Sequence, residues 1–250
     1  MLREALSPAL LRNPASVKLL HQRVNIMGSQ GRWKEAAADA ARCIELKPSE
    51  HYYYHILAPL LVMNRNLPAY EQLCGKIQAT FTNTTNPYWA ERMAIDCLLR
   101  PNPVVDLHLA DRMADTAVTL GSRQKNRLPH FQVCKAMSSY RLGRYAEATT
   151  WANKSLDGSP AYIGTDPWLV NNARPQACAV MSMANWQLGR PVEARQMLAK
   201  SEALAPDIAF KRGVDNFTGP WIDWAITRIE INEAKALVES ESPQGPPNKP

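Results

Sequence analysis

The chain has 250 residues, of which 46% are hydrophobic, 21% charged and 8% aromatic, with 19 prolines and 11 glycines. This composition excludes disorder for most of the chain and allows one or two compact domains or one elongated array. The longest uncharged apolar run, residues 56–63, is far shorter than the roughly 20 residues of a membrane-spanning helix. Because the N-terminus also lacks a signal peptide, we expect a soluble, cytoplasmic protein with no membrane partner.

The spacing of the cysteines argues against a zinc or redox site, and the distribution of charge argues against a nucleic-acid site. The five cysteines are scattered and form no CxxC pair, which zinc sites and redox pairs need, so we expect them reduced and buried. The net charge of +6 is spread over the chain. The one dense basic stretch, residues 123–127, does not recur from unit to unit as a stripe along phosphates would. We therefore expect no nucleic-acid partner.

A repeat is visible in three segments, each with Gly-Arg followed by Glu-Ala at the fourth and fifth residues after the glycine. A proline follows the glycine at the same distance in all three. The glycines are Gly31, Gly143 and Gly189, and the prolines are Pro48, Pro160 and Pro206. This periodicity predicts a helical hairpin of about 34 residues.

Each conserved feature of the unit has a physical role in such a hairpin. The glycine permits the tight turn between two helices, and an aromatic residue, Trp33 or Tyr145, fills the space at the turn. A small residue lets the two helices approach closely, and the proline ends the second helix. The small residues are Ala36, Ala148 and Ala194. In these residues the chain resembles the tetratricopeptide repeat (TPR) family.

The resemblance implies an all-α, right-handed α-solenoid over residues 1–239. In chain order we expect an N-terminal half-repeat, about five TPR-like hairpins, a capping helix and a disordered, proline-rich tail. The second unit keeps the apolar register although Arg65 replaces its turn glycine. The expected hairpins span about 17–50, 51–86, 87–121, 127–160 and 174–207, the capping helix about 219–238, and the tail 240–250.

The capping helix is strongly amphipathic. Its pattern predicts Trp221, Trp224, Ile231 and Leu237 facing the array, and Glu230, Glu233 and Lys235 facing solvent. Together with residues 67–74 (LPAYEQLC) and 96–101 (DCLLRP), this helix resembles the C-terminal TPR region of planctomycete-type bacterial serine/threonine kinases and WD40 proteins. That narrower resemblance implies an alternative function, a regulatory or localisation module belonging to a larger signalling polypeptide.

No catalytic motif is evident, and neither a phosphate-binding loop nor a kinase phrase is present. His51 and His55 have a spacing that could share a metal ion, but no third ligand is evident and ordinary helix-surface histidines are the other interpretation. Asp111 and Asp115 are expected on a solvated helix face, because an acid/base pair needs burial to separate its pKa values. We expect no enzyme activity, no metal and no cofactor.

The predicted function is non-catalytic binding of a protein or peptide in the concave groove that the first helices of a solenoid line. The TPR register implies which side chains face that groove, and aromatic, Met and Arg residues there are typical of binding hot spots. The alternative for Tyr140, Met183 and Trp186 is packing on neighbouring helices. Asn25 has no matching Asn one unit on, where Pro59 stands, so a carboxylate clamp is not expected. The groove residues are His21, Asn25, Tyr52, His55, Met63, Arg92, Ile95, His130, Met137, Tyr140, Arg141, Met183, Trp186 and Gln187.

Overall fold

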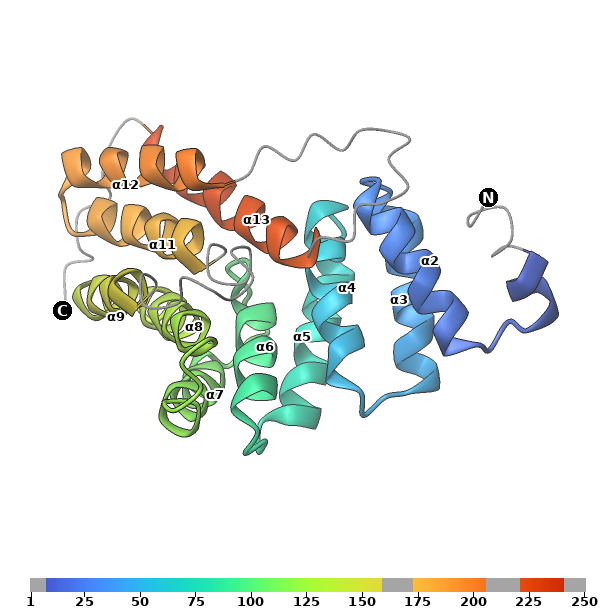
Figure 1. Cartoon of the computed structure of the whole chain (residues 1–250). Coiled ribbons are helices and arrows are strands. Elements are labelled where there is room, and N and C mark those ends of the chain that lie inside the picture. The colour runs from blue at the N-terminus through green and yellow to red at the C-terminus, as the bar shows by residue number, and fades with distance from the viewer. Residues whose placement is uncertain (1–7, 159–172, 206–220, 241–250) are drawn as a thin grey trace.

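The computed structural model describes residues 8–158, 173–205 and 221–240. These residues form paired antiparallel helices and contain no strand, which confirms the prediction of an all-α solenoid (Figure 1). The expected tail, apart from residue 240, and the prolines Pro160 and Pro206 lie outside the described residues. No helix in the described ranges is long and apolar enough to cross a membrane.

In the described parts of the chain, five helix pairs follow one another, and α13 (Trp221–Val238) follows the last pair. The first helices of the pairs are α2 (Val17–Ser29), α4 (His51–Met63), α6 (Pro87–Leu98), α8 (Leu128–Arg141) and α11 (Ala173–Gln187). The second helices are α3 (Trp33–Leu46), α5 (Leu67–Phe81), α7 (Leu107–Leu120), α9 (Tyr145–Gly158) and α12 (Pro191–Leu204).

The turns inside the pairs have the geometry that the repeat predicts. Gly31, Gly143 and Gly189 have φ values of 70°, 75° and 71°, in the left-handed region that glycine adopts readily. Arg65 has a φ of 58° at the equivalent turn of the second pair. The second unit therefore keeps the backbone of the turn without the glycine.

Small residues separate the two helices of a pair, as expected. The side chains of Ala36, Ala148 and Ala194 are fully buried, and the Ser182 hydroxyl donates a 2.8 Å hydrogen bond to the carbonyl of Ala194. At the N-terminal end, residues 8–12 are helical, and Leu10 packs against Leu20 of α2 and Cys43 of α3. All five cysteines are free and buried, as predicted.

The last helix does not simply stack on the end of the array. Helix α13 contacts α11 and α12, and it also contacts α4 and α2 near the other end of the chain (Figure 1). Since α2, α4 and α11 are first helices, α13 lies along the face that the first helices line. It therefore spans the solenoid from the last helix pair to the first.

Candidate functional site

The residues predicted to line the concave groove differ in exposure. Some are buried, and the remainder are half-buried. The buried residues are His55, Ile95, Met137, Met183 and Trp186. The half-buried residues are His21, Asn25, Tyr52, Met63, Arg92, His130, Tyr140, Arg141 and Gln187.

Arg141 is held by α13. Its guanidinium makes a bidentate ion pair with Glu233, with 2.6 Å between Nη2 and Oε2, and its Nε donates a 3.0 Å hydrogen bond to the carbonyl of Leu98. The Arg141 side chain is only 6% exposed. Next to this ion pair, burial raises the pKa of Tyr140 to about 12. Arg141 therefore contributes to the docking of α13, and the Tyr140 ring lies 5.5 Å from its guanidinium.

Glu230, one turn before Glu233 on α13, is fully buried, and neither of its carboxyl oxygens has a hydrogen-bond partner. Burial raises its pKa to about 8, although the nearby Arg141 opposes that shift. The prediction that Glu230 and Glu233 face solvent is wrong. A capping helix would leave one face open, whereas α13 contacts helices from both ends of the array.

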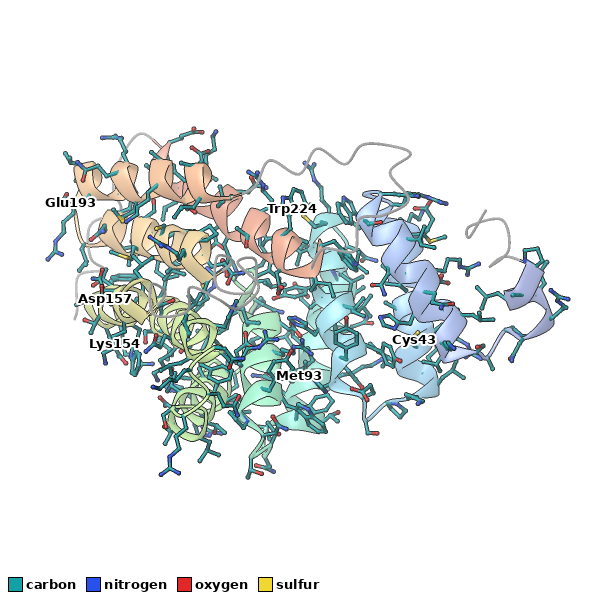
Figure 2. The ribbon with its side chains drawn as sticks, in the orientation of Figure 1. Cys43, Met93, Lys154, Asp157, Glu193 and Trp224 are labelled. Carbon is teal, nitrogen blue, oxygen red and sulfur yellow. The ribbon has the colours of Figure 1, made fainter. Side chains whose placement is uncertain are left out.

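The N-terminal end of α13 packs against the first helix pair. The indole Nε1 of Trp221 donates a 3.2 Å hydrogen bond to Oδ1 of Asn25, and the same ring lies directly over Gly28. The ring of Trp33 lies 6.4 Å from that of Trp221 and stacks 6.5 Å from that of Trp224. Figure 2 shows Trp224 on α13 beside α4. Three tryptophans thus join α13 to the first pair.

His55 forms part of the interface between α4 and α6. Its Nδ1 lies 2.9 Å from Oδ1 of Asp96, and the Tyr70 hydroxyl donates a 2.8 Å hydrogen bond to the Asp96 carbonyl. Burial lowers the pKa of His55 to about 3 and raises the pKa of Asp96 well above its usual value. In the described part of the chain, no group of three His, Cys, Asp or Glu side chains could hold a metal ion.

A group of rings and cations lies where α4, α6 and the start of α8 meet, and we call it the Arg92 cluster. The Arg92 guanidinium lies 4.0 Å from the Tyr88 ring centroid and 5.2 Å from that of Tyr52, and it also donates a hydrogen bond to the Tyr88 hydroxyl. Arg127 lies 5.0 Å from the same Tyr88 ring. His51 stacks on Trp89 and lies 3.3 Å from Arg92 through its Nε2. The cluster comprises His51, Tyr52, Tyr88, Arg92 and Arg127.

The positive charges of the Arg92 cluster come from its two arginines, and neither arginine has a carboxylate in an ion pair among the described residues. Oε1 of Glu50 lies 3.2 Å from Nδ1 of His51, and Asp223 of α13 is near enough to act electrostatically on Tyr52 and His55. Within the described ranges, neither carboxylate is within ion-pair distance of Arg92 or Arg127. The nearby carboxyl group of Glu91 has its pKa raised by burial to about 7, so it is only partly ionised at neutral pH. Burial also lowers the pKa of His51 to about 4, which leaves the two arginines as the positive charges.

Sequence reasoning identified Tyr52 and Arg92 but not Tyr88 or Arg127. Tyr88 precedes Arg92 by one helical turn on α6, and this i, i+4 spacing of a tyrosine and an arginine is a signal that could have identified it. Arg127 immediately precedes α8, outside the helical positions that the TPR register counts. The register therefore could not include it.

Comparison with known proteins finds similar solved structures but no similar sequence family. No protein-family model and no curated protein matches the sequence. Among solved structures, the chain is similar to yeast Tom70, with 18% identity and a TM-score of 0.42 over 92% of this chain, and it spans 42% of the Tom70 chain. It is also similar to a tetratricopeptide repeat protein from Parabacteroides merdae, with 13% identity and a TM-score of 0.48 over 92% of this chain and 91% of that one.

Both TM-scores are below 0.5, so the assignment of the fold depends on the helix pairs and turns described above. The resemblance to the repeat region of bacterial kinases and WD40 proteins stays a prediction, as does the cytoplasmic location.

Proposed function

We propose that the chain is a non-catalytic protein-interaction scaffold whose concave face binds an acidic peptide segment at the Arg92 cluster. The observation that carries this proposal is the arginine held against Tyr52 and Tyr88 with no carboxylate partner among the described residues. A guanidinium stacked on aromatic rings is already oriented, and its planar fork matches a carboxylate with two parallel hydrogen bonds.

The position of α13 limits where such a peptide can lie. Arg141 on α8 is paired with Glu233 of α13, and Met183 and Trp186 are buried on α11, against which α13 packs. Helix α13 also contacts α4 and α2. Half-buried predicted groove residues remain on α2, α4 and α6. They are His21, Tyr52, Met63 and Arg92, together with Asn25, which is bonded to Trp221 of α13. The ring of His21 on α2 lies 5.4 Å from that of Tyr52 on α4, so these two half-buried residues are neighbours across the two helices.

The proposal is tested by selecting ligands for the full chain from a random displayed-peptide library. We expect the selected peptides to be enriched in Asp and Glu, and their affinity to fall as salt is added, because exposed charges are screened. Arg92→Lys keeps the charge but loses the planar fork, so it should weaken binding by about tenfold or more.

Arg112→Gln is the matched control, since Arg112 is an exposed arginine on α7, outside the Arg92 cluster. Its affinity for the selected peptides should equal that of the original chain. Selected peptides without acidic enrichment, or an unchanged affinity in Arg92→Lys, would contradict the proposal.

A further inference from the structure

The outer side of the first two helix pairs contains an open cleft of about 580 Å³. We call it the outer cleft. Helices α3 and α5 form its walls, and Tyr54, Leu57 and Leu61 of α4 form its apolar floor. Alanines make up most of the apolar lining of the walls, which leaves the space between the helices open. The wall residues are Ala37, Ala38, Ala41, Ile44, Ala69 and Leu73.

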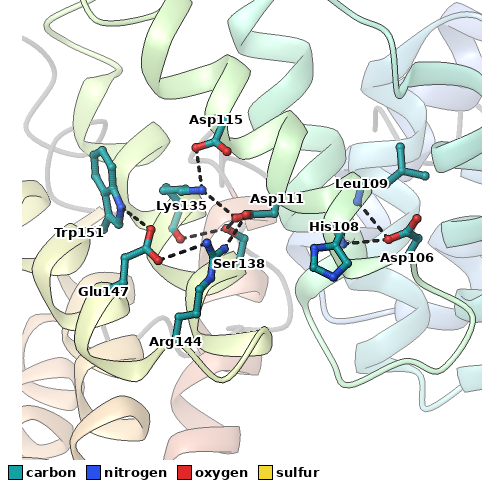
Figure 3. A network of polar contacts seen from close by, with 10 residues as sticks. All are labelled: Asp106, His108, Leu109, Asp111, Asp115, Lys135, Ser138, Arg144, Glu147 and Trp151. Atoms are coloured by element: carbon teal, nitrogen blue, oxygen red, sulfur yellow. Dashed lines mark hydrogen bonds and ion pairs between the residues drawn. The ribbon is translucent and has the colours of Figure 1, made fainter.

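The equivalent space two repeats further on, between α7 and α9, is occupied by the chain's own side chains (Figure 3). Lys135 of α8 is buried there and lies 2.8 Å from Asp111 and 2.6 Å from Asp115, both on α7. Arg144, at the start of α9, lies 2.5 Å from Asp111 and 3.2 Å from Glu147. Asp111, expected on a solvated face, is therefore buried in an ion-pair network because a lysine from the next helix faces it.

The two spaces can be compared residue by residue. Helices α3 and α7 both have 14 residues and align from their first residues, and Arg65 aligns with Gly143 as the turn residue with positive φ. In this alignment the charged members of the network have small, apolar or uncharged counterparts that line the outer cleft. The same holds for Trp151, whose Nε1 donates a 3.3 Å hydrogen bond to Glu147. Asp111 corresponds to Ala37, Asp115 to Ala41, Lys135 to Leu57, Arg144 to Asn66, Glu147 to Ala69 and Trp151 to Leu73.

The rim of the outer cleft has a net positive charge. Lys34 of α3 and Lys76 of α5 are exposed, and neither has an ion-pair partner within the described ranges. The one acidic lining residue, Glu45, is already paired with Arg42 at 2.6 Å. An occupant with negative charge beside an apolar face would complement this rim.

We propose that the outer cleft binds an amphipathic helix of a partner protein, with apolar side chains in the cleft and acidic residues toward Lys34 and Lys76. A helix that places an apolar stripe in a hydrophobic groove is a common mode of recognition. The cleft volume also lies within the range of natural ligand sites, roughly 300–1,000 Å³. This site lies on the outer side of the solenoid and is independent of the peptide site proposed for the concave face.

The test uses the full chain and two synthetic peptides of about 18 residues, long enough to form helix. Both carry leucines at i, i+3, i+4 and i+7, and their flanking positions are Glu in one peptide and Lys in the other. Binding is measured by fluorescence anisotropy. We expect the Glu peptide to bind at least about tenfold more tightly than the Lys peptide.

Two kinds of variant locate the binding. Ala41→Phe fills the cleft from the α3 wall and should abolish binding of the Glu peptide. The double change Lys34→Glu with Lys76→Glu alters only exposed side chains and should reverse the preference between the two peptides. The matched controls are Ala146→Phe on α9 and Lys200→Glu on α12, both at exposed positions outside the cleft, and they should leave both affinities unchanged.

Equal affinity for the two peptides, no measurable binding of either, or an unchanged preference after the double charge reversal would overturn the proposal. Binding that survives Ala41→Phe in a folded protein would also overturn it. Arg92→Lys should leave binding of the Glu peptide unchanged. The proposals for the outer cleft and for the concave site are then tested separately. Loss of the Glu peptide on Arg92→Lys would place that peptide on the concave face instead.

Discussion

Trp221 donates a hydrogen bond through its indole Nε1 to Oδ1 of Asn25 across 3.2 Å, and this contact joins residues 196 positions apart. We expect Trp221→Ala to lower the free energy of unfolding by about 3–5 kcal/mol, because it removes a buried ring as well as the hydrogen bond. Chemical denaturation measures the loss, and hydrogen exchange should increase in α2. An exchange pattern in α2 equal to that of the original chain would contradict this assignment.

Substitution by alanine should have opposite effects on the free energy of unfolding at Gly28 and at Gly75. A Cβ on Gly28 would come within 2.7 Å of the Trp221 ring, so Gly28→Ala should lower the free energy of unfolding by about 1–3 kcal/mol. A Cβ on Gly75, inside α5, would meet only Val104 at 3.9 Å. Gly75→Ala should therefore raise the free energy of unfolding by about 0.5–1 kcal/mol. Thermal or urea denaturation of the two variants compares the signs.

The buried Glu230 should make stability fall as the pH rises. With its pKa raised to about 8, the folded chain binds more protons than the unfolded chain between pH 6.5 and pH 8. The free energy of unfolding then decreases across this window, by at most about 1.4 kcal/mol per pH unit for one group. His51 and His55, whose pKa values are lowered in the folded chain, are neutral there but partly protonated in the unfolded chain near pH 6.5. They therefore oppose this decrease at the lower end of the window, whereas at its upper end they are neutral in both states.

Glu230→Gln removes this titration, so we expect it to reduce the slope and to raise stability at pH 8. Glu91, whose pKa is raised to about 7, contributes a second slope in the same direction, which Glu91→Gln removes separately. Urea denaturation at pH 6.5, 7.2 and 8 measures each slope. An unchanged slope in Glu230→Gln would show that this carboxyl titrates normally in the folded chain.

Arg65 has a left-handed backbone without being glycine, which costs a residue with a side chain roughly 1–2 kcal/mol. Arg65→Gly removes this strain, and the greater freedom of glycine in the unfolded chain offsets about 0.5–1 kcal/mol of the gain. We expect a net rise of about 0.5–1 kcal/mol in the free energy of unfolding. Gly143→Ala, with a φ of 75° and open space around its Cβ, should give the opposite sign.

The ion-pair network on α7, α8 and α9 should depend mainly on its buried members. Asp111→Ala removes the carboxylate that both Lys135 and Arg144 contact, so it should lower the free energy of unfolding by about 3–5 kcal/mol. The Asp115 side chain is 53% exposed, and Asp115→Ala should cost only about 0–1 kcal/mol. Equal losses in the two variants would show that burial does not decide the contribution.

The repeat register could be predicted because Gly31, Gly143 and Gly189 mark turns whose backbone glycine adopts readily, and because the alanines behind them are small. The same periodicity predicts Tyr52 and Arg92 for the inner face. The location of α13 could not be predicted in this way. An amphipathic pattern shows which side chains of a helix are apolar, but it does not show which of several apolar surfaces that helix covers.

Glu230 illustrates this limit. Its position in the pattern assigns it to the polar side of α13, and it is buried because helices at both ends of the array contact α13. The outer cleft shows a similar limit, since alanines on α3 and α5 have the same spacing whether they pack against a neighbour or leave a space. Both features depend on how distant helices are arranged. The local periodicity of the sequence carries no information about that arrangement.

Helix α13 contacts both α2 in the first pair and α12 in the last pair, so it connects the two ends of the array directly. In an open repeat array, stability is approximately a sum of repeat and nearest-neighbour contributions, and the end units can unfold alone. Here the first pair cannot separate without breaking contacts to the last helix, so fraying from the N-terminal end is coupled to the C-terminal end. The array should unfold in a single transition, and a change in its curvature would require α13 to detach first.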